Sequence, residues 1–220
     1  MKIKEILIDI IDYLDAYEKE NDGKEISLNT TDFIGYVNAH HKFDSIKQNQ
    51  VSGKNEDWRE LQTNENGSNT DISILVVMLF RYAKGYIKKA LKNSKIKTAD
   101  DFSFMITLLT YDSMTKMELT NLQIMEKTSG NEIINRLIKI GLVEQSQDEN
   151  DKRSVRIKLT EAGKKEIISV LPQMRLVSQI VIGDLNENEI NTLAYMLRKL
   201  DHYHNDIFTS KKDIELTELV

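Results

Sequence analysis

Two polar stretches of this 220-residue chain hold the side chains best suited to recognition chemistry. In the first, Asn131 and Asn135 lie four residues apart and Arg136 follows directly. A carboxamide or guanidinium group can form two parallel hydrogen bonds with one planar partner, as asparagine does with adenine and arginine with guanine. The second stretch is basic, and its candidates for pairing with phosphate oxygens are Lys152, Arg156 and Lys158. What these side chains can reach depends on the elements that carry them.

The basic stretch falls in a predicted β-hairpin. Gly141 can adopt the left-handed conformation that ends a helix, and residues 142–146 then form a short extended run. Residues 154–159 alternate between polar and apolar side chains, which is typical of a half-buried strand. The connecting residues 147–153 are all polar and rich in turn formers, so the tip of the hairpin is expected in solvent. The basic residues of the second strand then lie on its polar face, which by itself would also explain their charge.

Two short helices precede the hairpin. Thr115 and Glu118 form the S/T-x-x-E capping box that starts a helix. After a break at residues 125–128, apolar side chains recur at helical spacing from Ile133 to Ile140, which predicts a second helix. Each piece alone would also fit a helical core with an incidental hairpin. Together, the order helix, turn, helix and hairpin is the plan of a winged helix-turn-helix. The polar face of the second helix carries Asn131, Glu132, Asn135, Arg136 and Lys139.

Four segments of this region resemble the signature of the MarR family of bacterial transcription regulators. They are Thr115-Lys116-Met117-Glu118-Leu119, Arg136-Leu137-Ile138-Lys139-Ile140-Gly141-Leu142-Val143, Asp151-Lys152-Arg153 and Leu159-Thr160-Glu161-Ala162-Gly163. With the flanking helices, the resemblance covers residues 70–208. It implies a homodimer that binds double-stranded DNA, with the two recognition helices in major grooves and the wings reaching toward minor grooves. It also implies that a small-molecule effector can weaken DNA binding.

The resemblance assigns roles at the tip of the hairpin. Arg153 is expected to enter a minor groove, where A·T-rich sequence concentrates negative potential. Asp151 would brace the tip by pairing with an arginine, although it also fits a plain turn. On the second helix, Ser129 and Glu132 are spaced as another capping box, which would engage Glu132 with the backbone. An A·T-leaning site is expected, contacted by Ser129, Asn131, Glu132, Asn135, Arg136, Asp151, Lys152, Arg153 and Arg156.

The composition argues against several other classes of protein. The absence of cysteine leaves no disulfide framework and no thiolate nucleophile. The longest apolar run, at residues 74–80, is shorter than the roughly 20 residues that cross a bilayer, and the charged start lacks a signal-peptide layout, so we expect a cytoplasmic protein that does not bind membranes. The histidines, at 40, 41, 202 and 204, lack the spacing of metal ligands. With no phosphate-binding loop or nucleophile motif, we expect neither an enzyme nor a bound cofactor or metal.

The net charge of −5 is unevenly distributed. Residues 1–70 contain eight Lys and Arg against fourteen Asp and Glu, whereas the rest of the chain contains 22 against 21. The acidity therefore lies outside the predicted winged helix. This distribution matters more than the sum for a protein that meets a polyanion.

The remaining sequence predicts a mainly α (α+β) fold with long dimerisation helices and an N-terminal helical extension. We expect an acidic extension at 1–68, a MarR-like domain at 69–210, with its helix-turn-helix at about 114–140 and wing at about 142–159, and a tail at 211–220. The extension contains a helix up to Asn21 and a short helix from Asn29 or Thr30. Its first helix has an apolar stripe that should dock on the dimer's own helices.

Three long helices are predicted to form the dimer, at 71–93, 161–183 and 187–208. The first is expected to be capped by Asp71 and is apolar almost all round from Ile72 to Phe80, so it needs cover on more than one side. Thr160 caps the second helix, which Pro172 is expected to bend. Asn186 and Glu189 are positioned to cap the last, and another helix is expected over 98–111.

Two other functions fit the same residues. The first is a winged helix that serves as a protein-protein interaction module without direct DNA readout, which the acidic extension permits. The second is a ligand-responsive protein whose effector cleft lies between the dimer helices and the helix-turn-helix. Aromatic side chains at helical spacing are also common in cores, so this cleft is the weaker interpretation. Its lining would come from Tyr82, Tyr86, Phe102, Phe104 and Tyr111.

Overall fold

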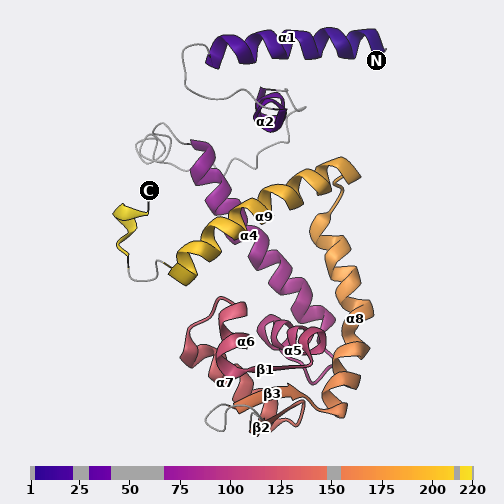
Figure 1. Cartoon of the computed structure of the whole chain (residues 1–220). Helices are drawn as coiled ribbons and strands as arrows, with labels where there is room; N and C mark the ends of the chain where they lie inside the picture. The colour runs from indigo at the N-terminus through magenta and orange to yellow at the C-terminus, as the bar shows by residue number, and fades with distance from the viewer. Residues whose placement is uncertain (1–2, 22–29, 41–66, 148–154, 211–213, 220) are drawn as a thin grey trace, which may run out of the picture. The chain divides into compact units, whose positions relative to one another are not determined.

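The computed structural model describes residues 3–21, 30–40, 67–147, 155–210 and 214–219 (Figure 1). The chain divides into two compact units, residues 1–61 and 62–220, which are considered separately. The first unit contains α1 (Ile3–Asn21) and α2 (Thr30–His40), both as predicted. Tyr17 of α1 is buried, with its ring centroid 5.6 Å from that of Phe33 and 5.2 Å from that of Tyr36.

The second unit is mainly helical, with one small sheet. None of its described helices, nor those of the first unit, is both long and apolar enough to cross a membrane. The domain limits predicted at residues 68 and 210 stay predictions. In chain order the elements are α4 (Gly67–Ala90), α5 (Ala99–Tyr111), β1 (Ser113–Thr115), α6 (Lys116–Leu122), α7 (Lys127–Lys139), β2 (Val143–Gln147), β3 (Val155–Leu159), α8 (Glu161–Ile182), α9 (Glu187–Ser210) and the 3-10 turn η1 (Leu216–Glu218).

The sheet has the strand order β1-β3-β2, with both pairs antiparallel. The hairpin β2–β3 confirms the predicted wing, with Val143 opposite Leu159 at its base. Strand β1 was not predicted, because three residues are too few to show an alternating pattern. It pairs with β3, with Met114 opposite the fully buried Ile157.

One hydrophobic core joins α5, α6, α7, the sheet and the first turns of α8. Figure 1 shows α5, α6 and α7 gathered beside the sheet. Its central side chains, each at most 1% exposed, are Phe104, Leu119, Leu137, Ile157 and Ile167. Two glycines make close approaches in this core. A Cβ at Gly130 would overlap the side chain of Thr120 between α7 and α6, and one at Gly163 would overlap the carbonyl oxygen of Leu142 where α8 meets the wing. Both contacts require glycine because no side chain fits between the elements.

Side-chain caps mark the first residues of two helices, as the sequence predicts. Thr160 caps α8 by accepting a hydrogen bond from the Gly163 amide at 2.9 Å, as predicted. Asn186 likewise accepts from the Glu189 amide at 3.1 Å at the start of α9. The prediction that Asp71 caps the preceding long helix is wrong, because α4 begins at Gly67. The polar residues before Asp71 read as a loop in sequence, yet they form the first turn of this helix.

Candidate nucleic-acid interface

Helix α7 presents one apolar and one polar face, as its sequence predicts. Ile133, Ile134 and Leu137 are buried in the core at 6% exposure or less. Asn131 is half-buried, which leaves it less accessible than Asn135. The exposed residues of this helix are Lys127, Thr128, Ser129, Glu132, Asn135, Arg136 and Lys139. The polar face therefore displays carboxamide, hydroxyl and charged groups of both signs on a well-anchored helix.

The start of α7 differs from the prediction. The helix begins at Lys127, after Glu126 at the N-cap, and no side chain forms the capping hydrogen bond. Ser129 lies inside the first turn, so the predicted capping box between Ser129 and Glu132 is wrong. The Gly130 amide already donates to the carbonyl oxygen of Glu126 at 3.0 Å, which makes this an established helical turn. Glu132 is exposed on the second turn of this helix.

Arg136 is joined to a buried carboxylate on another helix. Its Nε and Nη2 atoms donate to Asp101 Oδ1 at 3.0 and 2.5 Å. Asp101 is 2% exposed and Arg136 is 46% exposed. The other oxygen of Asp101 accepts from the backbone amides of Lys97 and Thr98 at 3.2 and 3.1 Å. One carboxylate therefore caps α5 and holds the last turns of α7, and the guanidinium predicted to read DNA is engaged inside the protein.

The sequence analysis did not connect Asp101 with Arg136. Asp101 lies near the start of the helix expected over 98–111, and Arg136 lies on the polar face of the predicted second helix of the helix-turn-helix. The two residues are 35 positions apart, so no local spacing connects them. Their opposite charges were the available signal, but many such pairs exist in a chain with 30% charged residues.

The turn between α6 and α7 is held by polar side chains of α5. Gln123 donates through Nε2 to Thr107 Oγ1 at 2.9 Å and accepts a short hydrogen bond from Ser103 Oγ. Ile124 follows with φ of 53°, a left-handed conformation that is unfavourable for a β-branched residue. Its amide donates to the Asn121 carbonyl at 2.9 Å, which closes α6 where glycine is the usual residue. The entry into α7 is thus set by tertiary contacts.

The base of the wing is fixed to β1, while its tip lies outside the described residues. Arg156 donates to Ser113 twice, from Nε to Oγ at 3.1 Å and from Nη2 to the carbonyl oxygen at 2.7 Å. Lys158 lies 3.3 Å from a carboxylate oxygen of Glu144 on the neighbouring strand. The remaining wing residues predicted to contact DNA, Asp151, Lys152 and Arg153, fall in the segment that is not described, so their roles stay predictions.

The predicted effector residues lie in different environments. Phe104 is a core residue with no exposed surface, and Phe102 packs partly buried against the same core. Tyr86 is half-buried, whereas Tyr82 and Tyr111 are 56% and 58% exposed. Among the cavities found in the described part of the chain, Tyr82 lines the groove between α4 and α9. The single chain therefore does not gather these aromatic rings around one of those cavities.

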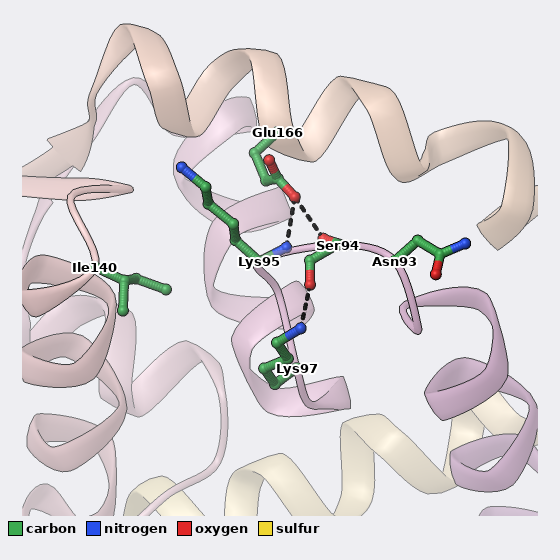
Figure 2. Close-up of a pocket in the computed structure, with 6 residues that line it drawn as sticks. All are labelled: Asn93, Ser94, Lys95, Lys97, Ile140 and Glu166. Atoms are coloured by element: carbon green, nitrogen blue, oxygen red, sulfur yellow. Dashed lines mark hydrogen bonds between the residues drawn. The ribbon is translucent and has the colours of Figure 1, made fainter.

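A second polar cluster fixes the turn between α4 and α5. Figure 2 shows Glu166 of α8 accepting hydrogen bonds from the Ser94 hydroxyl and the Lys95 amide, each at 2.7 Å. The hydrogen bond from Ser94 lowers the pKa of Glu166 below its ordinary value of 4.5; burial opposes this shift, and the Lys95 amide and the charges of Lys95 and Lys97 add to it. Within the described residues, no group of three or more His, Cys, Asp or Glu is arranged to hold a metal.

Comparison with known proteins supports the winged-helix assignment. The family described as "Winged helix DNA-binding domain" matches residues 105–163, which run from α5 to the start of α8. The HTH-type transcriptional repressor NicR of Pseudomonas putida is 29% identical over 103 residues. That alignment covers 47% of this chain and 65% of NicR, just under two thirds of its length.

Solved structures show the same fold over a larger part of the chain. A mutant MarR from E. coli, complexed with operator DNA, has a TM-score of 0.58 at 23% identity and covers 63% of this chain and 99% of its own. BpsR of Bordetella bronchiseptica has a TM-score of 0.56 at 21% identity, with 60% and 98% covered. Its structure concerns regulation of its DNA binding by 6-hydroxynicotinic acid.

The Asp101–Arg136 pair predicts a measurable coupling energy. Arg136→Ala removes two charge-assisted hydrogen bonds and leaves a buried carboxylate short of partners, so the free energy of unfolding should fall by about 1.5–3 kcal/mol. Asp101→Asn should have a similar effect, and the double variant should lose clearly less than the sum of the two. Urea denaturation of all three variants measures this. Arg175→Ala, an exposed arginine of α8, is the control and should change stability by less than about 0.5 kcal/mol. Additive losses would show that the pair is not coupled.

The lowered pKa of Glu166 predicts a pH-dependent contribution to stability. Because its pKa is lower in the folded than in the unfolded chain, its stabilisation is present above pH 4.5 and is lost as the pH falls through the folded pKa. Glu166→Gln should therefore be less stable than the unaltered protein at pH 7, by about 1 kcal/mol for a partly solvated charged hydrogen bond. The difference should shrink on acidification below pH 4.5. Glu161→Gln, whose side chain is 82% exposed, is the control. A difference that is constant with pH would contradict the assignment.

Proposed function

We propose that the chain is a winged-helix regulator of the MarR family that binds DNA sequence-specifically, regulates transcription and acts as a homodimer. The observation that carries the proposal is the exposed polar face of α7, held on a closed core by the Asp101–Arg136 pair. A helix fixed in this way can be inserted into a groove without losing its orientation. The proposed site of action is the cytoplasm, where bacterial DNA lies.

Helix α7 has dimensions and side chains suited to the major groove. Its 13 residues span about 20 Å at 1.5 Å per residue, and the groove is about 12 Å wide, which admits one helix. Asn135 is exposed on this face, and its carboxamide can pair with adenine in a bidentate manner. Because Arg136 is paired with Asp101, base reading would depend on Asn135 and its polar neighbours. In this proposal the wing carries Arg153 toward the adjacent minor groove.

A second copy of the chain is the proposed cover for α4 and α9. The face of α4 is apolar and accessible in the single chain, with Leu75 65% and Phe80 61% exposed. Together the two helices form an apolar groove of about 910 Å³, whose lining includes Ile72, Leu75, Leu79, Leu193, Leu197 and Leu200. Exposed apolar surface on this scale typically marks an interface between proteins. Dimerisation would also place two copies of α7 on one duplex.

Release by a small molecule is a further part of the proposal. Its support is a structural neighbour, BpsR, whose DNA binding is regulated by 6-hydroxynicotinic acid. The cavities found in the described residues do not gather the predicted aromatic side chains, so in this proposal the dimer completes the effector site.

A protein-interaction module is the alternative function. It is favoured by three apolar side chains exposed on α6 and the turn after it, Met117, Leu122 and Ile124, at 68%, 51% and 54%. Apolar groups exposed on a helix-turn-helix suit a protein partner better than a phosphate backbone. Binding to duplex DNA distinguishes the two functions.

Selection of bound fragments from a random duplex pool tests the proposed function. The protein should enrich a defined sequence, and binding should weaken steeply as the salt concentration rises. Asn135→Ala should weaken binding to the enriched site by about 1–3 kcal/mol while leaving binding to unrelated duplex nearly unchanged. Asn191→Ala, an exposed asparagine of α9, is the matched control and should have no effect on either. Failure to enrich any sequence would favour the interaction module.

Sedimentation equilibrium tests the homodimer. The protein should have twice the chain mass of 25.4 kDa at micromolar concentration. Leu75→Asp should shift it toward a monomer, because it places a charge in the apolar surface of α4. Met117→Asp introduces the same charge at a comparably exposed apolar residue of α6 and should leave the mass unchanged. A monomeric unaltered protein would contradict the proposal.

A further inference from the structure

The largest acid-free cluster of lysines in the sequence lies outside both the helix-turn-helix and the wing. Residues 84–97 contain six lysines and no Asp or Glu. Residues 116–139, which include α6 and α7, contain four basic and three acidic residues, and Arg136 among them is already paired with Asp101. The element proposed to read bases is therefore nearly neutral. A protein that binds a polyanion needs its neutralising charge elsewhere.

Five of these lysines form what we term the lysine belt, at the end of α4 and in the turn to α5. All five side chains are exposed. Favourable interaction with the C-terminus of α4 would account for the two in its last turn, but the other three lie beyond the helix. Within the part of the chain that the structure describes, no carboxylate lies within 4 Å of a belt ammonium group. The belt consists of Lys88, Lys89, Lys92, Lys95 and Lys97.

The turn that displays the belt is rigidly anchored. Leu91 and Ile96 are buried in the core at 1% and 0% exposure, and Ser94 is 8% exposed. Their burial fixes the backbone of the turn, and Lys97 adds to this by donating from Nζ to the Ser94 carbonyl oxygen at 2.5 Å. Glu166 accepts hydrogen bonds from the Ser94 hydroxyl and the Lys95 amide, as Figure 2 shows. A long lysine side chain loses less entropy on binding when its backbone is already fixed.

The same turn lies against the C-terminal end of α7. Ile140, which ends that helix, lines the same cavity as Lys95 and Lys97. The amide of Lys97 donates to Asp101, which in turn binds Arg136 of α7. A helix seated in a major groove has phosphates on both sides of it, so a surface joined to the end of α7 lies close to one of these backbones.

We infer that the lysine belt binds the sugar-phosphate backbone of the duplex beside the bases that α7 reads. This inference rests on the proposed function. The belt supplies the part of the DNA affinity that does not depend on sequence, because α7 carries little net charge. Helix α7 supplies the preference for one base sequence over another. The carboxylate of Glu166 interacts with the charges of Lys95 and Lys97 and offsets part of the positive charge, but five lysines against this one acid leave the belt positive.

The test compares two variants of equal charge. In the belt variant, Lys88→Gln, Lys92→Gln and Lys95→Gln are combined, since none of these ammonium groups has a partner among the described residues. The control variant combines Lys4→Gln, Lys19→Gln and Arg198→Gln, which are exposed and lie outside the winged helix. Affinity for a 40-base-pair duplex of random sequence is measured as a function of salt concentration. Neutralising one lysine that pairs with a phosphate should reduce the slope of log affinity against log salt by about 0.9.

The belt variant should therefore show a slope that is smaller by about 2–3 units for each protomer, while the control variant keeps the slope of the unaltered protein. Thermal denaturation should be the same for all three proteins, because the substituted side chains are exposed. If both variants keep the full slope and the unaltered protein still binds, the belt inference is wrong and the proposed function stands. Equal reductions of the slope in both variants would also overturn it, since the effect would be one of net charge. If the unaltered protein shows no salt-dependent binding to any duplex, the proposed function itself fails.

Discussion

The carboxylate of Asp101 is the constraint on which the geometry of the winged helix depends. It is almost completely buried, so its charge must be compensated within the protein. Two backbone amides at the start of α5 and the guanidinium of Arg136 do so together. The same interaction therefore starts one helix and orients another. Removing Arg136 leaves a buried charge without compensation, and removing Asp101 loosens the recognition helix. This pair therefore matters more than the exposed ion pair between Lys158 and Glu144 in the wing.

Close packing at two glycines also fixes how the helices of the winged helix lie against one another. Gly130 lets α7 approach α6, and Gly163 lets α8 approach the base of the wing, at distances that leave no room for a methyl group. In the sheet, Arg156 joins β3 to β1 through its hydrogen bonds to Ser113. Two residues that sequence alone marked for DNA contact, Arg136 and Arg156, thus have structural partners. The exposed side chains of α7, the lysine belt and Arg153 of the wing are the contacts that we propose with DNA.

Local signals in the sequence predicted much of this fold. The capping box of Thr115 and Glu118 and the cap at Thr160 are formed as expected, because they depend on residues only three positions apart. The alternation in residues 154–159 gave the strand that forms the wing. Strand β1 and the start of α7 were missed, since one is too short for a pattern and the other has no side-chain cap. The left-handed Ile124 could not be predicted, because tertiary contacts through Gln123 impose a conformation that sequence associates with glycine.

In the proposed complex, recognition is divided among a nearly neutral helix that reads bases, a basic turn that meets the backbone, and the wing, which carries Arg153 toward a minor groove. The central claim is that α7 faces the bases. Because the chain has no cysteine, Asn135→Cys creates a single thiol that can carry a photoactivatable aryl azide. Irradiation with the selected duplex should crosslink this position to bases within the enriched sequence, whereas the same probe at Asp184→Cys, in the turn between α8 and α9, should not react with DNA. A protein that binds the duplex but crosslinks only from Asp184→Cys, or from neither position, would contradict the account.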